Sequence, residues 1–234
     1  MSSKFRIWHI SDTHGMHDQL TVPDQSNPET RVDMVIHSGD ASSVRDIQLN
    51  VAEMGRFLNW FSQLPIQHKV FVAGNHDGSV AHKLHSKESM GAMGITYLEC
   101  ESTEIAGFRI YGAPWTPTYG NWSFMTGRSV IYRIWETIPQ DTDILITHGP
   151  PYGILDTTEN SSNSIELCGD SALLTVVHRL NLQLMCFGHI HNTGKIINAG
   201  TRTIAGKDTI FSNGIIVEDG RWGKLCSNGN IITL

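Results

Sequence analysis

The chain has 234 residues, and 23 acidic against 17 basic side chains give it a formal charge of −6 at pH 7. This length allows a substantial core, and 40% hydrophobic with 17% charged residues excludes a disordered protein. The acidic balance argues against binding to duplex nucleic acid, and no apolar run approaches the roughly 20 residues of a membrane span. With four scattered cysteines and no signal-peptide pattern at the start, we expect a cytoplasmic protein.

Short apolar segments alternate with a helical pattern in the first part of the chain. Residues 5–10 alternate in polarity as a strand does, and 34–37 and 69–72 are apolar runs typical of buried strands. Apolar residues recur at steps of three and four over 47–61. This spacing predicts an amphipathic helix whose apolar side faces a core.

The second part of the chain continues in the same way. It predicts a hairpin over 104–111, strands over 144–147 and 185–187, and a helix over 171–180. The C-terminal third, with Asp219-Gly220 as a turn, is typical of antiparallel strands. Strands followed first by helices and later by hairpins predict the α/β class with more than one sheet, in a single domain over 1–234.

Five of the predicted strands end in a short loop that carries His, Asp or Asn beside small residues. The carboxyl ends of strands in α/β sheets are where functional side chains gather, so we expect these loops to line one crevice. The side chains concerned are Asp12, His14, Asp40, Asn75, His76, His148, His189 and His191.

The residue types in these loops indicate a metal site. Two Asp, one Asn and four His supply oxygen and imidazole donors without a thiolate. This set suits Mn, Fe or Zn, and it is too rich in nitrogen for a dedicated Ca or Mg site. Seven ligands exceed the needs of one tetrahedral ion and fit two divalent ions that share a bridging carboxylate.

Short motifs follow one another in a fixed order along the chain: D-x-H at 12–14, G-D at 39–40, G-N-H-D at 74–77, T-H-G-P-P at 147–151 and F-G-H-I-H at 187–191. This order resembles the calcineurin-like metallophosphoesterase superfamily. Residues 57–65, 107–115 and 147–156 are similar to the small metallophosphoesterase-domain-containing (MPPED-like) phosphodiesterases. The similarity covers the chain from about Phe5 to about Val217. It implies a four-layer α/β/β/α sandwich, in which helices flank two mixed β-sheets.

The resemblance also implies a role for each loop residue. It places Asp12, His14 and His191 on the first metal ion, Asn75, His148 and His189 on the second, and Asp40 between the two ions. In the implied mechanism a hydroxide that bridges the ions attacks phosphorus. His76 is not a ligand in the family pattern, and it is placed to assist the leaving group as a general acid.

One position departs from the pattern of the protein phosphatases in this superfamily. They carry an Asp three residues after the bridging Asp, and Ser43 stands there in this chain. Without that carboxylate His76 is a poorer acid unless another group supplies the charge. The usual Arg after this loop is also unmatched, and Arg45 is a weak substitute. Both departures argue against a protein phosphatase, and they are compatible with an enzyme of low turnover rate.

We therefore predict a hydrolase of phosphodiester bonds, with cyclic nucleotides or other small phosphodiesters favoured by resemblance. A phosphomonoesterase or nucleotide pyrophosphatase would share every metal ligand, and a non-catalytic metal-binding scaffold that docks a partner would share the fold. Trp115, Tyr119 and Trp122 are candidates for stacking against a substrate ring, although packing explains them as well. Residues 161–164 are interpreted as a loop near the cleft.

Overall fold

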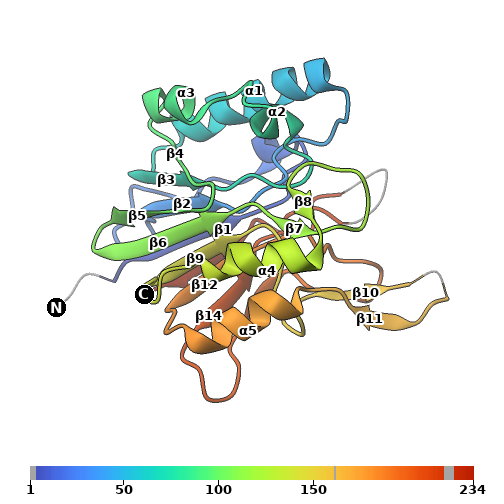
Figure 1. Ribbon diagram of the computed structural model, residues 1–234. Helices are drawn as coiled ribbons and strands as arrows, with labels where there is room; N and C mark the ends of the chain where they lie inside the picture. Colours follow the sequence, from blue (N-terminus) through green and yellow to red (C-terminus); the bar gives the residue numbers. More distant parts are fainter. Residues whose placement is uncertain (1–3, 161, 219–223) are drawn as a thin grey trace.

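The computed structural model describes residues 4–160, 162–218 and 224–234. Within these ranges the chain forms two large β-sheets with helices on their outer sides (Figure 1). The four layers make the α/β/β/α sandwich that the resemblance implies. The Asp219-Gly220 turn and Ser161 lie outside the described residues.

Four strands from the first 97 residues and the last strand of the chain build a five-stranded sheet. Its order is β15 (Asn230–Thr233), β1 (Arg6–Ile10), β2 (Met34–His37), β3 (His68–Phe71) and β4 (Thr96–Tyr97). Strands β1 to β4 run parallel, and β15 runs antiparallel to β1. The helices α1 (Ile47–Gln63), α2 (Gly78–Ala81) and α3 (Lys87–Ala92) lie over this sheet at the top of Figure 1.

The longest helix, α1, forms as the apolar spacing predicts. The side chain of Asp46 caps its first turn by accepting hydrogen bonds from the backbone amides of Gln48 and Leu49. Its apolar side, which includes Phe57 and Phe61, is buried against the five-stranded sheet in one continuous core. This packing fixes the helix above the loops that follow β1 and β2.

Strands from Glu101 to Asn213 build a six-stranded sheet. Its order is β13 (Gly200–Arg202), β14 (Ile210–Asn213), β12 (Leu184–Phe187), β9 (Ile144–Thr147), β6 (Phe108–Ala113) and β5 (Glu101–Ile105). The predicted hairpin is the antiparallel pair β5–β6. The helices α4 (Arg128–Glu136) and α5 (Ser171–Arg179) pack on the outer side of this sheet around a second core.

The C-terminal strands are only partly antiparallel. Strands β13 and β15 run antiparallel to their neighbours, as predicted, but β14 pairs parallel with β12. The long connection over 188–209 returns the chain to the starting edge, so β14 runs in the same direction as β12. The expectation of an antiparallel C-terminal third is wrong for the pairing of β14 with β12, and it holds for the pairing of β14 with β13.

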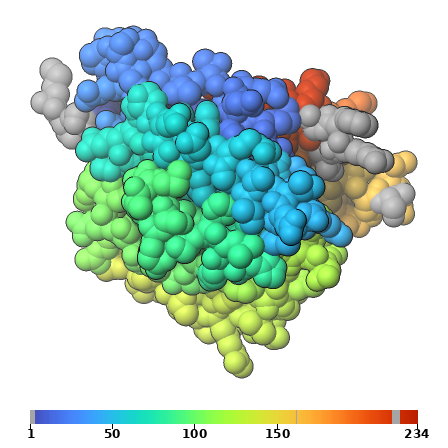
Figure 2. All heavy atoms as spheres, turned by 90° about the horizontal axis from the view of Figure 1, so that it is seen from above, coloured from blue at the N-terminus to red at the C-terminus, as the bar shows by residue number. Residues whose placement is uncertain are grey.

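Small elements complete the fold. They are the 3-10 turn η1 (His17–Gln19), the pair β7 (Thr116–Pro117) and β8 (Met125–Thr126), and the hairpin β10 (Thr157–Glu159) and β11 (Ile165–Leu167). The β10–β11 hairpin projects from the edge of the molecule in both overall views (Figures 1 and 2). The four cysteines are free thiols. Among the described residues, no helix is both long and apolar enough to cross a bilayer.

A third core lies between the two sheets and holds them face to face. Apolar side chains from both sheets meet there, including Ile36 and Val70 from one sheet and Ile146 and Leu184 from the other. Strands covered on both sides need apolar residues on both, which explains the uninterrupted apolar runs in the sequence. This core therefore fixes how the strand ends of one sheet lie relative to those of the other.

Truncating a side chain in the core between the sheets should destabilise the protein strongly. Leu184 is 0% exposed, so Leu184→Ala removes buried contacts and leaves a cavity, which costs about 2–5 kcal/mol. Ile231 on β15 is 51% exposed, so Ile231→Ala is the matched control and should cost far less. Urea unfolding measures both variants. Equal midpoints for the two variants would contradict the assignment of this core.

Candidate metal centre

The seven side chains with metal-ligand character lie together at one edge of the sandwich. Each follows the carboxyl end of a central strand, from β1, β2 and β3 in one sheet and from β9 and β12 in the other. Because the sheets pack face to face, these ends meet. The residues are Asp12 and His14 after β1, Asp40 after β2, Asn75 after β3, His148 after β9, and His189 and His191 after β12.

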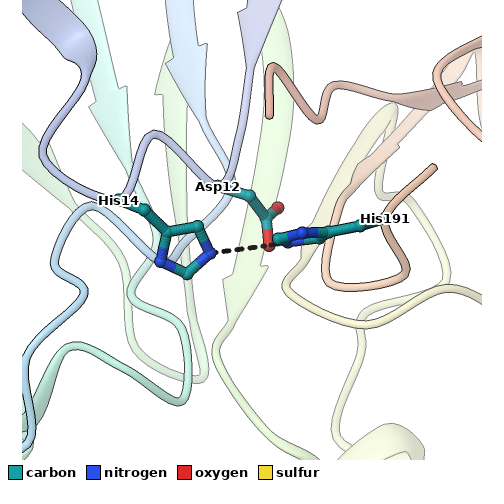
Figure 3. Close-up of side chains that lie close together, drawn as sticks. All are labelled: Asp12, His14 and His191. Atoms are coloured by element: carbon teal, nitrogen blue, oxygen red, sulfur yellow. Dashed lines mark hydrogen bonds and ion pairs between the residues drawn. The ribbon is translucent and has the colours of Figure 1, made fainter. Parts of the chain in front are cut away.

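Asp12, His14 and His191 form a first group, in which one donor atom of each residue lies within 4.8 Å of the others. Figure 3 shows both imidazole rings beside the Asp12 carboxylate. The Oδ1 atom of Asp12 lies 2.9 Å from Nε2 of His191 and 3.9 Å from Nε2 of His14. Since Asp12 follows β1 and His191 follows β12, both sheets contribute to this group.

Asp40, His148 and His189 form a second group that meets the same distance limit. The Nε2 atom of His148 lies 3.3 Å from Oδ2 of Asp40 and 3.0 Å from Oδ1 of Asn75. The same Asp40 oxygen lies 3.9 Å from Nε2 of His14, which belongs to the first group. The Asp40 carboxylate therefore lies between the two groups.

Two of the imidazoles present Nε2 to the cluster because Nδ1 is used elsewhere. Nδ1 of His14 lies 3.0 Å from the carbonyl oxygen of Ser42, and Nδ1 of His148 lies 3.0 Å from that of Ser38. A carbonyl only accepts, so each Nδ1 carries the proton and donates it. The Nε2 lone pair of a neutral His148 then faces the Asp40 carboxylate, and the two repel unless a cation lies between them. These residues therefore fit a divalent metal ion.

Mutual charge interactions set the ionisation of the cluster. Burial disfavours the charged form of both carboxyl groups. Nevertheless, the charge of His148 holds the pKa of Asp40 well below its usual range. A hydrogen bond and the charge of His191 likewise lower the pKa of Asp12. Burial also opposes the charged ring of His148, but Asp40 raises its pKa to about 9. Burial and the charge of His148 lower the pKa of His189 to about 3. A bound cation would take over the role of the proton on His148 in balancing the carboxylates.

The backbone of the cluster is strained at several ligand positions. Asp12, His14, Asp40 and His189 have φ values of 53°, 42°, 56° and 71°, in the left-handed region that residues other than glycine rarely adopt. Strain gathered in this way is typical of functional sites. Gly74 permits the close approach of the β3 loop, because a Cβ there would lie 2.3 Å from Oδ1 of Asp40.

Asp77 ties the loops after β2 and β3 together, a role that was not expected from the sequence. Its carboxylate accepts hydrogen bonds from the backbone amides of Asp40, Ser42 and Gly74, at 3.0, 2.9 and 2.7 Å. Burial and the charge of Asp40 raise the pKa of Asp77 to about 7, against the three donors that favour the carboxylate. The sequence feature that pointed to Asp77 was its position directly after Gly74-Asn75-His76 in the motif.

His37 supports the first metal-binding motif from behind. Its Nδ1 accepts from the backbone amide of Gly39 at 3.2 Å, so Nε2 carries the proton and donates to Oγ1 of Thr13 at 3.0 Å. Burial lowers the pKa of this ring to about 3, so it stays neutral against Phe57. Thr13 lies between two candidate ligands, and His37 thereby helps to orient their loop.

His76 lies beside the cluster. One of its ring nitrogens lies within 4.8 Å of the donor atoms of His14 and Asp40. Its backbone amide donates to Oδ1 of Asp40 at 2.7 Å, and its Nδ1 donates to the carbonyl oxygen of Ser43 at 3.2 Å. With Nδ1 so engaged, Nε2 is the atom available to a bound molecule.

A cleft of about 590 Å³ opens over the cluster, and His14, Asp40 and His76 lie in its wall. Of the three candidate aromatic residues, Trp115 and Tyr119 line this cleft. The third, Trp122, packs against His76 with the two ring centroids 4.1 Å apart, and the guanidinium of Arg45 lies 3.6 Å from the centroid of the Trp122 ring. Trp122 is therefore placed to support His76.

Comparison with known proteins agrees with this architecture and with the motifs. The model of the calcineurin-like phosphoesterase family matches residues 5–193. The chain is 31% identical over 218 residues to human metallophosphoesterase domain-containing protein 1, covering 83% of this chain and 63% of that protein. It is 33% identical over 218 residues to UPF0046 protein C25E10.12 of Caenorhabditis elegans, covering 86% and 74%.

The chain belongs to the calcineurin-like phosphoesterase family, which confirms the resemblance stated from the motifs. It spans less than two thirds of the length of the human relative. The fold is also similar to the crystal structure of TT1561 of Thermus thermophilus, with a TM-score of 0.60, 12% identity, and coverage of 90% of this chain and 88% of that chain.

Asp77→Asn should loosen the candidate metal centre while leaving all seven candidate ligands unsubstituted. An amide in place of the carboxylate offers one acceptor oxygen and turns an N–H toward backbone donors, which costs about 1–3 kcal/mol. We expect a lower urea midpoint and weaker Mn²⁺ binding by calorimetry. Asp24→Asn, at an exposed loop position, is the control. Unchanged metal affinity in Asp77→Asn would show that Asp77 does not organise the site.

Proposed function

We propose that this chain hydrolyses phosphodiester bonds with the help of two divalent metal ions, and that its substrates are small phosphodiesters such as cyclic nucleotides. Family membership supports a metal-dependent phosphoesterase. The observation that carries the proposal is the position of the Asp40 carboxylate between two groups of imidazoles. One carboxylate shared in this way is what a pair of ions requires.

Each group of residues would hold one ion. We assign Asp12, His14 and His191 to the first ion, Asn75, His148 and His189 to the second, and Asp40 to both. The donor set favours Mn, Fe or Zn. Ions bound there supply Lewis-acid activation of water and of the phosphoryl group. The neutral amide of Asn75 leaves two carboxylates among the seven side chains, so a pair of divalent ions keeps the site positive and attractive to an anion.

His76 is assigned to the leaving group. It lines the cleft. The hydrogen bond from Nδ1 to the Ser43 carbonyl fixes the ring and leaves Nε2, on the opposite side of the ring, available to a substrate. When the ring is protonated, Nε2 can donate its proton to the oxygen that departs from phosphorus. A neutral carbonyl stabilises the charged ring less than a carboxylate does, which supports a slow enzyme.

The cleft supports a diester with an organic substituent. Among the described residues that line it, Arg128 carries the one Lys or Arg side chain, while Trp115 and Tyr119 offer aromatic surface. A diester carries one charge where a monoester carries up to two, so it needs fewer cations beside the metal ions. The flat faces of the two aromatic residues suit a ring system such as a nucleobase.

Hydrolysis of bis-p-nitrophenyl phosphate beside p-nitrophenyl phosphate, with Mn²⁺ added, tests the proposal. We expect faster and metal-dependent cleavage of the diester. Asp40→Asn should abolish turnover and reduce the bound metal measured by elemental analysis, because it removes the shared charge. Faster monoester cleavage would indicate a phosphomonoesterase. Metal binding with no turnover of either ester would indicate a scaffold, and near-normal turnover in Asp40→Asn would rule out the two-ion site.

His76→Ala should leave the metal content unchanged and slow the reaction according to the leaving group. Departure of a poor leaving group needs a proton, so we expect a loss of about 10²-fold or more for diphenyl phosphate. Bis-p-nitrophenyl phosphate, whose leaving group departs without help, should be affected much less. Equal slowing of both substrates in steady-state kinetics would count against a general acid at this position.

A further inference from the structure

The loop after β2 connects His76 to a buried carboxylate that lies outside the candidate metal centre. The Nδ1–H of His76 donates to the carbonyl oxygen of Ser43 at 3.2 Å. The next backbone amide, that of Val44, donates to Oε2 of Glu53 at 3.2 Å. The Ser43 carbonyl and the Val44 amide belong to the same planar peptide group. A single peptide group therefore links the imidazole ring to the carboxylate.

Glu53 is held firmly in this position. It lies on α1 and is 7% exposed, which is unusual for a glutamate. Besides the Val44 amide, it accepts from the Ser43 backbone amide and from the Ser43 hydroxyl, both at 2.8 Å. Gly15 passes so close that a Cβ there would lie 2.5 Å from Oε1. The three donors all come from the segment that carries the partner of His76.

The chemistry of the link follows from the polarity of the peptide group. The carboxylate of Glu53 accepts a hydrogen bond from the Val44 N–H and polarises the peptide group. This polarisation increases the negative charge on the Ser43 carbonyl oxygen at the other end of the group. That oxygen then becomes a stronger acceptor for the Nδ1–H of His76. No proton moves along the path, because only the polarisation of the peptide changes. The side chain of Ser43 points to Glu53 and not to the imidazole.

We propose that Glu53 is a positioning residue for His76, and that it increases, through the Ser43–Val44 peptide, the negative charge on the carbonyl oxygen that accepts from the ring. The proposal rests on the proposed function, in which His76 protonates the leaving group. Trp122 adds a second support, since it packs against the imidazole ring and is itself covered by the guanidinium of Arg45. Together these contacts fix the tautomer and the plane of His76.

The first test compares leaving groups in Glu53→Gln, which keeps the size of the side chain and removes its charge. We expect kcat for diphenyl phosphate to fall about 10-fold, with KM nearly unchanged, and bis-p-nitrophenyl phosphate to change less than about twofold. Glu88→Gln, the same change at an exposed position on α3, is the matched control. Equal slowing of both substrates, or no slowing at all, would overturn the proposal.

A double-mutant cycle separates positioning from general loss of structure. If Glu53 acts through His76, Glu53→Gln should have no further effect on diphenyl phosphate hydrolysis once His76→Ala is present. If Glu53 only stabilises the fold, the two losses should multiply. If the double variant loses the product of the two single losses in rate, the proposal is overturned, even if Glu53→Gln alone slows diphenyl phosphate hydrolysis.

Ring nitrogen NMR of the metal-free protein gives a reading that does not depend on activity. With ¹⁵N-labelled histidine, the His76 signals are assigned by their loss in His76→Ala. We expect the neutral ring to have its proton on Nδ1 in the native chain and to shift toward a mixture of tautomers in Glu53→Gln. An unchanged tautomer in Glu53→Gln would overturn the proposal. If the native chain hydrolyses no phosphodiester, the proposed function fails, and this measurement alone decides whether the link exists.

Discussion

Burial of Asp40, whose side chain is 3% exposed, is the constraint around which the site is arranged. A buried charge costs several kcal/mol unless opposite charge and hydrogen bonds compensate it. One oxygen of Asp40 accepts from the His76 amide, and the other lies between Nε2 of His14 and Nε2 of His148. Its own backbone amide donates to Asp77 and its φ is 56°. The loops after β1, β2, β3 and β9 thus all converge on this one carboxylate, and divalent cations would complete its compensation.

The two-sheet architecture is what makes such convergence possible. Asp12, Asp40 and Asn75 come from the five-stranded sheet, whereas His148 and His191 come from the six-stranded sheet. The distances between the two sets depend on the apolar core that holds the sheets face to face. Close-packed interiors transmit small displacements, so this core determines the ligand geometry as well as the stability. Ligands that lie far apart in the sequence are therefore held at fixed distances by the apolar core between the two sheets.

Much of this structure follows from local sequence patterns. The apolar runs and the spacing over 47–61 predict the strands and α1, because each reports its own periodicity. The polar residues that follow the strands predict the composition of the cluster. The direction of β14 was not predictable, since it depends on the path of a long connection. Glu53 was missed for a similar reason: its partners lie ten residues away along the chain, and only the docking of α1 brings them together.

The placement of Glu53 behind a peptide group has a consequence for the charge of the site. A carboxylate in direct contact with His76 would lie near Asp40 and His14, where it could compete for a cation and repel an anionic substrate. Glu53 instead has its oxygens occupied by donors from Ser43 and Val44. The charge that reaches His76 through the peptide is partial, so it can fix the tautomer of the ring while adding little repulsion toward a phosphodiester. This arrangement makes His76 a weaker general acid than a direct carboxylate contact would, and it keeps the site attractive to anions.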